Sequence, residues 1–262
     1  MRVKFLHISD LHFSFTYDKG DERFCRMMIK MTSPLEQIKK LFDEVEKDFD
    51  FVCVTGDICE YGTVEEYRFI HDWLEAYFGC RIIGVSGNHE NKKAFIHGFL
   101  GKDHLDPLYE EHEFDGFRVI CFDSSDEKFN DGLITDKSCM LLRKSLENRD
   151  IPTVVLTHHH LIKKQFEMPV AQYGDEFREI IRNSNILAVL NGHTHHPYKG
   201  VFEGKPCYTA GSLSFVCECI NNELHCYEHA SAQRFTYENG VLSKTVFEEN
   251  SKPVFIDSFK LN

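Results

Sequence analysis

Seven potential metal ligands and one histidine that could transfer a proton occur in five short motifs of this chain. The motifs are Asp10-Leu11-His12, Gly56-Asp57, Gly87-Asn88-His89-Glu90, His158 within Thr157-His158-His159-His160, and Gly192-His193-Thr194-His195. Carboxylate, imidazole and amide ligands together suit divalent manganese, iron or zinc, and seven ligands are more than one ion usually takes. The sequence therefore predicts two metal ions, an arrangement that hydrolyses phosphate esters when the ions lie about 3.5 to 4 Å apart.

Each motif follows a short apolar run that predicts a buried strand. These runs are Val3–Ile8, Phe51–Val54, Arg81–Val85, Phe117–Phe122, Thr153–Leu156 and Ile186–Leu190. Helical spacing of apolar residues predicts helices over Pro34–Lys47, Thr63–Phe78 and Thr135–Leu146, the second opening with a capping box. The first two thirds of the chain therefore alternate strands with helices, and the motifs lie where strands end.

The last part of the chain has a different pattern. After Pro197 the sequence consists of alternating segments and turns, and Asn239-Gly240 is a strong hairpin signal. We expect a β-meander there. Because no repeat or linker separates the two parts, we expect one α/β domain over residues 1–262, with the motifs in 1–196 and a β-rich part of the same domain in 197–262.

Local geometry favours convergence of the motif side chains. Residues two apart in an extended backbone point to the same side, so Asp10 could grip an ion together with His12. The same reasoning applies to the two histidines of Gly192-His193-Thr194-His195. Gly56 permits a sharp turn that projects Asp57 from the end of its strand, where its carboxylate could bridge two metals.

The remaining motifs supply the other groups. Asn88 offers a neutral amide oxygen beside His89, whose imidazole is left free to donate a proton. His158 comes first after its strand, whereas His159, His160 and His196 are expected to flank the pocket or to hydrogen-bond to the ligands. Taken singly, such motifs are typical of turns and of solvated surface histidines. It is their combination and order that favour a metal site.

These residues resemble the blocks of the calcineurin-like metallophosphoesterase family, which run D-x-H, G-D, G-N-H-[D/E], H and G-H-x-H in the order found here. The resemblance extends from Asp10 to His195. The segments 5–12 and 56–67 are most similar to its class III cyclic-nucleotide phosphodiesterase branch. Prolines often follow the lone histidine in the family, whereas Leu161-Ile162 stand here. Among the three consecutive histidines, His158 is the expected ligand because it comes first after the strand.

The resemblance implies a fold, a cofactor and roles for the residues. It implies a four-layer αββα sandwich of two mixed β-sheets flanked by helices, with two divalent or mixed-valence Mn, Fe or Zn ions at the carboxyl ends of the strands. The first metal would be held by Asp10, His12, Asp57 and His195, and the second by Asp57, Asn88, His158 and His193.

In the corresponding mechanism a metal-bound hydroxide attacks phosphorus in line. His89 then protonates the departing alkoxide, and Glu90 is expected to orient His89. The preferred function is therefore hydrolysis of a small phosphodiester such as a cyclic nucleotide.

Bulk composition narrows the classes of partner. A formal net charge of -12 disfavours a long nucleic acid, so a small phosphoester is the expected substrate and a nuclease is the weakest enzyme alternative. The N-terminus shows no secretory leader pattern and no apolar run is long enough to span a bilayer, which favours a soluble cytoplasmic protein without a membrane partner. We therefore expect reduced thiols for the ten cysteines. Composition leaves the oligomeric state unknown.

Several alternatives stand beside this interpretation. The same two-metal core could serve a phosphomonoesterase or a pyrophosphohydrolase, and the fold could persist as a non-enzymatic scaffold. The long segment Phe13–Ser33 could cap the pocket, or a short helix within it could simply pack against the domain. The cysteines at 207, 217, 219 and 226, with His225 and His229, could suggest a further soft-metal site, although thiols in a strand more often pack as small hydrophobes.

Overall fold

Two β-sheets lie face to face at the centre of the computed structural model, which describes residues 1–126, 131–147, 150–163, 165, 168–248 and 252–260. The first sheet has the strand order β13-β12-β1-β2-β3. Its strands are β1 (Arg2–Ile8), β2 (Phe51–Thr55), β3 (Arg81–Val85), β12 (Ser231–Glu238) and β13 (Val241–Glu248). Strands β1, β2 and β3 are parallel, whereas β12 pairs antiparallel with both β1 and β13, so this sheet is mixed.

The second sheet is also mixed and has the order β4-β5-β6-β7-β9-β8. Its strands are β4 (Tyr109–Phe114), β5 (Phe117–Phe122), β6 (Thr153–Leu156), β7 (Ala188–Asn191), β8 (Tyr198–Phe202) and β9 (Lys205–Thr209). The two sheets bury a shared apolar layer in which Phe5 stacks on Phe51 and on Phe235, with ring centroids 4.8 and 5.1 Å apart. This layer explains why the parallel strands are continuous apolar runs.

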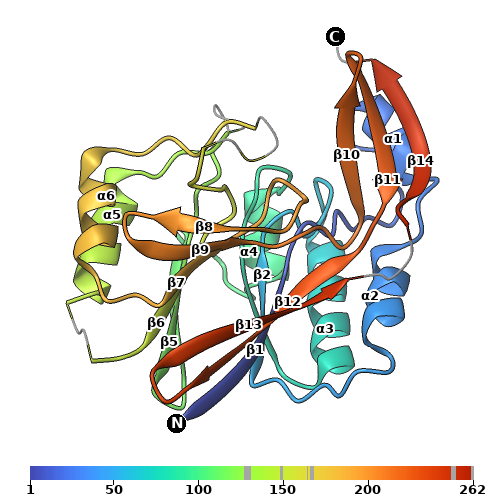
Figure 1. Cartoon of the computed structure of the whole chain (residues 1–262). Coiled ribbons are helices and arrows are strands. Elements are labelled where there is room, and N and C mark those ends of the chain that lie inside the picture. Colours follow the sequence, from blue (N-terminus) through green and yellow to red (C-terminus); the bar gives the residue numbers. More distant parts are fainter. Residues whose placement is uncertain (127–130, 148–149, 164, 166–167, 249–251, 261–262) are drawn as a thin grey trace.

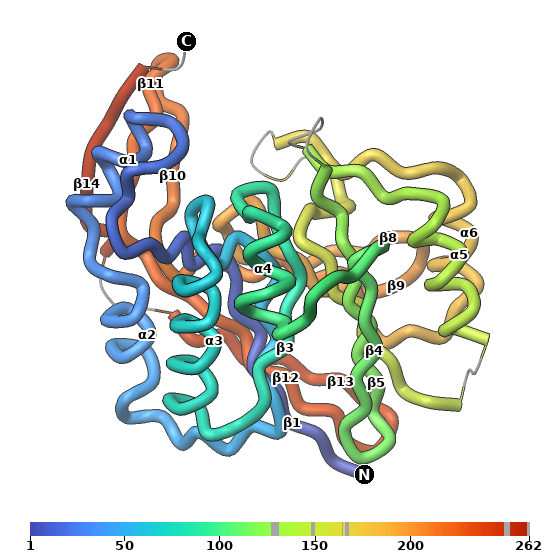
Figure 2. Tube along the Cα trace, turned by 180° about the vertical axis from the view of Figure 1, so that it is seen from behind, coloured from blue at the N-terminus to red at the C-terminus, as the bar shows by residue number. Residues whose placement is uncertain are grey.

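Helices cover the outer face of each sheet (Figures 1 and 2). The first sheet packs against α2 (Pro34–Phe42), α3 (Val64–Phe78) and α4 (Lys92–Gly98), and the second against α5 (Asp136–Ser145) and α6 (Asp175–Asn183). The layer order is therefore αββα, which confirms the predicted four-layer sandwich. None of the helices in the described ranges combines the length and apolar character needed to cross a membrane.

A third, smaller sheet protrudes beyond the carboxyl ends of the central strands, at the top of Figure 1. It has the order β10-β11-β14 and consists of β10 (Phe215–Ile220), β11 (Glu223–Glu228) and β14 (Val254–Lys260). The helix α1 (Glu22–Met28) packs on it through a separate core that includes Met27, Met28 and Phe215. The C-terminal strands are thus distributed over three sheets, so the expected β-meander was wrong.

Most predicted elements are present, but some bounds differ. The capping box of α3 is confirmed, because Thr63 Oγ1 accepts a hydrogen bond from Glu66 N and the Glu66 carboxylate accepts one from Thr63 N. The hairpin at Asn239-Gly240 joins β12 to β13, with φ of 51° and 83° at its two residues. Helix α2 ends at Phe42 rather than at Lys47, because the Val45 N–H bonds to the Phe42 carbonyl and turns the chain toward β2. The elements α4, α6, β4 and β14 were not predicted.

The cysteines differ from the expectation in one place. Cys217 and Cys226 face each other on β10 and β11 and form a disulfide, so the prediction that all ten thiols are reduced was wrong at this pair. The other eight cysteines are free, and most of them are buried. Cys207 accepts a hydrogen bond from Asn191 Nδ2 at 3.3 Å. None of the groups of close metal donors among the described residues includes a cysteine, and this gives no support to a further soft-metal site.

Candidate metal centre

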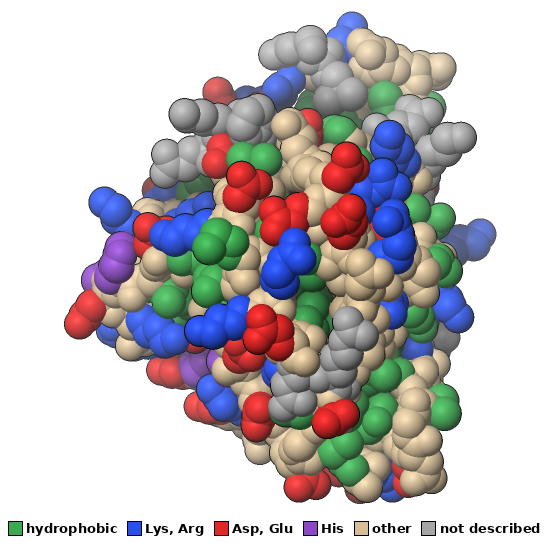
Figure 3. Space-filling view, turned by 90° about the vertical axis from the view of Figure 1, so that its left-hand side faces the viewer, with side chains coloured by type: hydrophobic (Ala, Val, Ile, Leu, Met, Phe, Trp, Pro, Cys, Tyr) green, Lys and Arg blue, Asp and Glu red, His purple; other side chains and the backbone are tan. Residues whose placement is uncertain are grey.

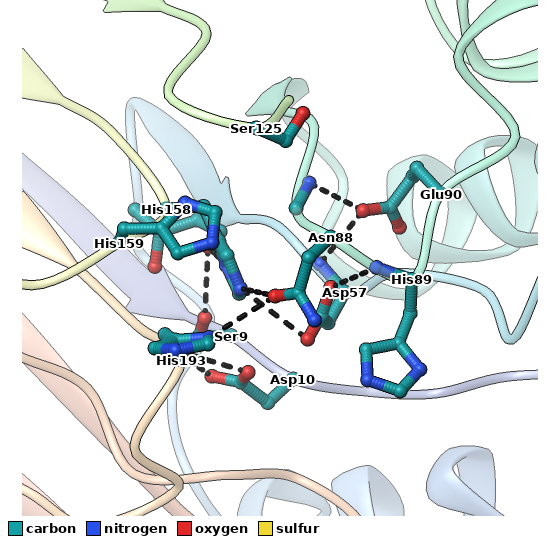
Figure 4. A network of polar contacts seen from close by, with 12 residues as sticks. Ser9, Asp10, Asp57, Asn88, His89, Glu90, Ser125, His158, His159 and His193 are labelled. Carbon is teal, nitrogen blue, oxygen red and sulfur yellow. Dashed lines mark hydrogen bonds and ion pairs between the residues drawn. The ribbon is translucent and has the colours of Figure 1, made fainter. Parts of the chain in front are cut away.

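All seven predicted ligands converge at the carboxyl ends of β1, β2, β3, β6 and β7, between the two central sheets. Figure 4 shows five of them with His89, His159 and Glu90 around one polar network. Asp10, His12, Asp57, His158 and His193 are all at least nine-tenths buried. Parallel strands place their carboxyl ends at one edge of the sheet, and for this reason residues far apart in the sequence meet there.

The first group of donors consists of Asp10, His12, Asp57 and His195, whose ligand atoms lie within 4.8 Å of one another. His12 Nδ1 donates to the Glu60 carboxylate at 2.8 Å, and His195 Nδ1 donates to the Phe215 carbonyl at 2.7 Å. Each ring therefore carries its proton on Nδ1 when it is neutral and presents an unprotonated Nε2 to the site. The two Nε2 atoms are only 3.1 Å apart. Two lone pairs at this distance repel each other unless a cation lies between them.

The second group repeats this arrangement. His158 Nδ1 donates to the Thr55 carbonyl at 2.6 Å, and its Nε2 faces Asn88 Oδ1 at 3.1 Å and Asp57 Oδ2 at 3.3 Å. Burial lowers the pKa of His158, but Asp57 raises it more, to about 9, so Nε2 can hold a proton in the position that a metal ion would take. His193 Nδ1 lies 3.1 Å from the same Asn88 oxygen. His193 Nε2 is buried without a hydrogen-bond partner among the described residues, and the oxygens of Asn88 and Asp57 both face His158 Nε2, so a metal ion would satisfy these atoms. The donor set therefore fits a metal ion in both groups.

Asp57 joins the two groups. Its Oδ2 lies 3.3 Å from His158 Nε2 in the second group and 3.7 Å from His12 Nε2 in the first. Its Oδ1 accepts a hydrogen bond from the backbone N–H of His89 at 3.0 Å, which fixes the carboxylate plane. Burial raises the pKa of Asp57, but the charges of the nearby His158 and His89 lower it by more, so the net result is a pKa well below its ordinary value. The side chain is therefore an anion.

The two histidines of the last motif differ from the others in charge. Burial lowers the pKa of both His193 and His195 well below the ordinary value, and the neighbouring imidazoles lower it further. Both rings are therefore neutral and can offer a lone pair to a cation. They also point to different groups: His193 lies with Asn88 and His158, whereas His195 lies with Asp10 and His12.

The backbone that presents these ligands is not extended. Five of the seven ligands have positive φ: 53° at Asp10, 47° at His12, 47° at Asp57, 73° at His193 and 60° at His195. The predicted extended backbone was therefore wrong for both pairs. Asp10 and His12 nevertheless lie in one donor group, as predicted, whereas His193 and His195 lie in different groups. Positive φ is uncommon for residues with a side chain, and its concentration here is typical of a functional site.

Hydrogen bonds between the motifs hold this backbone in place. The Asp10 N–H bonds to the Gly56 carbonyl at 3.0 Å and the His12 N–H bonds to the Asp57 carbonyl at 2.8 Å. The Asp10 carboxylate accepts the backbone N–H of His193 at 3.1 Å. The motifs therefore constrain one another before any ligand binds.

Glu60 is a functional residue that the sequence did not reveal. It lies in the irregular segment between β2 and α3, is buried, and accepts hydrogen bonds from both His12 Nδ1 (2.8 Å) and His89 Nδ1 (3.0 Å). Burial raises the pKa of Glu60, but the hydrogen bonds to the two imidazoles lower it more, to about 2. A loop carboxylate three residues after Asp57 carries no periodic signal that would have marked it.

Glu90 has a different role from the one expected. Its carboxylate accepts hydrogen bonds from the backbone N–H groups of Asp57 at 3.0 Å, Ile58 at 2.5 Å, Cys59 at 3.2 Å and Gly87. The prediction that Glu90 orients His89 was therefore wrong: Glu90 fastens the Asp57 loop to the Gly87 loop, and Glu60 contacts the His89 ring. Burial raises the pKa of Glu90 to about 7.

The other histidines of the triplet lie beside the site. His159 belongs to a group of close donors with His158 and His193, and its Nδ1 contacts Ser124 Oγ at 2.9 Å. His160 Nε2 lies 3.3 Å from the Met168 carbonyl, and burial lowers the pKa of His160 to about 4. Of the three consecutive histidines, only His158 places a ring nitrogen near both Asp57 and Asn88 in the contacts described.

A cavity of about 420 Å³ opens directly above both groups. Its floor includes Asp57, Asn88, His193 and His195, and His89 lies on its side. Phe24 and Met28 of α1 and several residues of the β10–β11 hairpin form the opposite side. Both interpretations of the segment Phe13–Ser33 therefore apply, because α1 packs on the small sheet and also borders the pocket.

Curated relatives are similar to this chain in sequence. A probable cyclic nucleotide phosphodiesterase of Rhodococcus erythropolis is 29% identical over 178 residues, covering 64% of this chain and 58% of the relative. A cAMP/cGMP dual specificity phosphodiesterase of Mycobacterium tuberculosis is 25% identical over 220 residues, covering 80% of this chain and 67% of the relative. The chain thus matches little more than half the length of the first of them.

The fold also matches solved structures of low sequence identity. GAP50 of Plasmodium, described as the anchor in the inner membrane complex, aligns with a TM-score of 0.62 and 13% identity, over 100% of this chain and 89% of that one. The model of the calcineurin-like phosphoesterase family matches residues 3–197, the range that contains every proposed ligand. The chain therefore belongs to the calcineurin-like phosphoesterase family.

Proposed function

We propose that this protein is a metal-dependent phosphoester hydrolase that cleaves a small phosphodiester, with a cyclic nucleotide as the preferred example. The observation that carries the proposal is the pair of donor groups joined by Asp57, with His89 beside them and a cavity above. The Rhodococcus and Mycobacterium relatives, which are named as cyclic nucleotide phosphodiesterases, support the same substrate class.

Two divalent ions fit the donors as follows. Asp10, His12, Asp57 and His195 would hold one ion, and Asp57, Asn88, His158 and His193 would hold the other. When bound, such a pair supplies an activated water and offsets negative charge on the phosphoryl oxygens. The mixed nitrogen and oxygen donors suit manganese, iron or zinc.

The chain's own residues supply the proton. His89 lies at the side of the cavity with its Nδ1 bonded to Glu60. Burial lowers the pKa of His89, but the charges of Asp57 and Glu60 raise it more, to about 10. The ring is therefore protonated near neutral pH and can donate a proton from Nε2 to the departing alkoxide. Glu60 fixes the orientation of this ring and that of His12 at the same time.

Beyond the two proposed ions and His89, the described lining of the cavity has no cationic side chain to bind a more highly charged substrate, and this supports a diester. Among the described residues that line the cavity there are the acidic side chains of Asp57, Glu60 and Asp131 but no lysine or arginine. On the face formed by α5 and α6, basic and acidic side chains are interspersed (Figure 3), and Arg143 and Arg178 pair with Glu176 and Glu203. Neither surface offers the basic stripe that a long nucleic acid requires.

A phosphomonoesterase or pyrophosphohydrolase is the second candidate, and one observation favours it. A neighbouring hollow that shares Asn88 with the cavity is lined by Lys19, Lys92 and Lys93. Lys19 and Lys92 pair with Glu66 and Asp123, at 3.4 and 2.7 Å, so most of this positive charge is already balanced. The hollow could therefore hold at most a weakly bound second phosphate.

The deciding experiment compares turnover of bis-p-nitrophenyl phosphate with that of p-nitrophenyl phosphate by the manganese-loaded protein. We expect the diester to have the higher kcat/KM, and faster cleavage of the monoester would reject the preference. Because the αββα fold also occurs in an anchor protein, the fold alone does not establish catalysis. Absence of hydrolysis across a broad phosphoester panel by metal-loaded protein would favour a scaffold instead.

A further inference from the structure

The cavity above the metal centre has two unlike sides. One part of the lining consists of polar ligands, and an adjoining part includes four apolar residues of α1, β10 and β11, which we call the apolar wall: Phe24, Met28, Phe215 and Leu224. Figure 1 shows α1 lying against the small sheet, beyond the ends of the central strands. A volume of about 420 Å³ is within the range of small-molecule sites.

The apolar wall begins directly at the metal ligands. The Phe215 ring lies 4.7 Å from the His195 ring and 5.2 Å from the His12 ring, and the Phe215 carbonyl accepts the His195 Nδ1 proton. The Phe24 ring follows at 6.4 Å from Phe215. An ester group attached to a phosphoryl group on the cavity floor can therefore extend along Phe215 toward Phe24.

The apolar wall is held in a fixed position. Phe24 packs edge-on against Phe259 of β14 at 5.0 Å, and Arg23 donates to the Lys260 carbonyl at 2.9 Å. Met28 and Phe215 share a buried core with Met27, and the disulfide between Cys217 and Cys226 joins the two strands of the hairpin. Phe24 and Leu224 nevertheless remain partly exposed, although their neighbours are buried. Apolar side chains that are held rigid and left open to a cavity favour binding of an apolar group.

Charge further limits what this group can be. None of the four side chains of the apolar wall can donate a hydrogen bond, and only the Met28 sulfur is a weak acceptor. The described residues that line the cavity include the carboxylates of Glu60 and Asp131 and no lysine or arginine that could pair with a further anion. An additional anionic group is therefore disfavoured, whereas a flat aromatic ring can pack on the partly exposed Phe24 ring.

We infer that the apolar wall is a subsite for an uncharged aryl or heteroaryl ester group of the phosphodiester. The inference rests on the proposed function for its substrate class, but the binding surface exists independently of the reaction. It identifies Phe24 and Leu224 as residues that determine specificity without contributing to the metal centre.

A binding experiment tests the subsite without requiring turnover. Diphenylphosphinate and dimethylphosphinate carry the same single charge and have no ester bond to hydrolyse. They differ only in having phenyl or methyl groups on phosphorus. We expect calorimetric titration of the manganese-loaded protein to give a Kd at least tenfold lower for the diphenyl compound, a difference of about 1.4 kcal/mol. Phe24→Ala and Leu224→Ala should each remove most of this preference and leave dimethylphosphinate binding unchanged.

Phe255→Ala is the matched control, because Phe255 lies on β14 of the same sheet, is 55% exposed and does not line the cavity. This variant should keep the full preference. Equal Kd values for the two phosphinates in the wild-type protein, or a preference that survives both Phe24→Ala and Leu224→Ala, would overturn the inference.

A kinetic comparison separates this inference from the proposed function. Bis-p-nitrophenyl phosphate and ethyl p-nitrophenyl phosphate release the same leaving group, so only the retained ester group differs. We expect Phe24→Ala to raise KM about tenfold for the diaryl ester alone. Hydrolysis of both esters with no dependence on Phe24 would leave the phosphodiesterase proposal intact and refute the subsite. If the protein prefers the diphenyl compound through Phe24 but hydrolyses neither ester, the subsite is supported and the phosphodiesterase proposal is refuted.

Discussion

Replacement of Glu60 by glutamine tests how the metal centre and the proton donor are coupled. The Glu60 carboxylate accepts hydrogen bonds from His12 Nδ1 at 2.8 Å and His89 Nδ1 at 3.0 Å, with almost no exposure to solvent. The amide of glutamine has one acceptor oxygen and one donor NH₂ group. One of the two rings must therefore face a donor with its own N–H, which forces it to move its proton to Nε2 or to rotate away.

The size of the expected loss follows from the one hydrogen bond to Glu60 that the substitution removes. A hydrogen bond to a charged group contributes about 1.5 to 3 kcal/mol, so losing one should reduce kcat/KM or metal affinity by roughly 10- to 100-fold. If the His12 ring changes, manganese content should fall, because its Nε2 is no longer a free ligand. If the His89 ring changes, metal content should remain and kcat should fall.

The pH profile distinguishes these outcomes from simple misfolding. The charge of Glu60 is one of three that raise the pKa of His89, with those of Asp57 and Glu90, so Glu60→Gln should lower this pKa. A general acid loses its proton as the pH rises through its pKa, and the basic limb of kcat/KM against pH should therefore move to lower pH. The assay is bis-p-nitrophenyl phosphate hydrolysis from pH 6 to 10 with metal analysis. The control is Glu65→Gln, an exposed glutamate at the start of α3. An unchanged rate, metal content and basic limb would refute the reasoning.

Four further outcomes are expected. Asp57→Ala should abolish turnover and reduce binding of both metals, whereas His89→Ala should slow turnover by roughly 100- to 10,000-fold with metal content intact, as measured by kinetics and elemental analysis. Gly87→Ala should lose metal and stability, because a Cβ there would lie 2.6 Å from the backbone nitrogen of Asp57; Gly174→Ala, with open space around it, should not. Removal of the metal ions by a chelator should lower the Tm of the wild-type protein, as measured by scanning calorimetry. The freed ligands should take up protons at constant pH, as measured by titration. Alkylation of the denatured protein should label eight thiols before reduction and ten after it.

The sequence was sufficient to place the central strands and the ligands because two periodic signals coincide. Continuous apolar runs such as Arg81–Val85 and Phe117–Phe122 match β3 and β5 residue for residue, since these strands are buried on both faces. Each ligand motif then follows a strand end, and parallel strands bring their ends together. Long-range convergence could therefore be inferred from local pattern alone.

Features determined by tertiary contacts were not predicted. Glu60 lies in an irregular segment, and its role depends on two histidines that approach it from other loops. Helix α6 is an exception, because its apolar residues Phe177, Ile180 and Ile181 already have helical spacing in the sequence. The third sheet could not be foreseen, because β10 and β11 pair with β14, which follows only after two strands of another sheet.

The positive φ of five ligands and the facing lone pairs have a common explanation. A left-handed residue with a side chain costs about 1 to 2 kcal/mol, so five of them cost roughly 5 to 10 kcal/mol, which is comparable with the whole stability of a typical domain. That cost is offset partly by the hydrogen bonds between motifs, including those of the Ser212 and Ser214 hydroxyls to the Asp10 carbonyl, both at 2.8 Å. These bonds hold acceptor atoms close together, an arrangement that stabilises nothing by itself. The fold thus maintains a geometry that lowers the free energy of the protein only when cations bind. This is the physical reason to assign the site to metal ions rather than to the structural core.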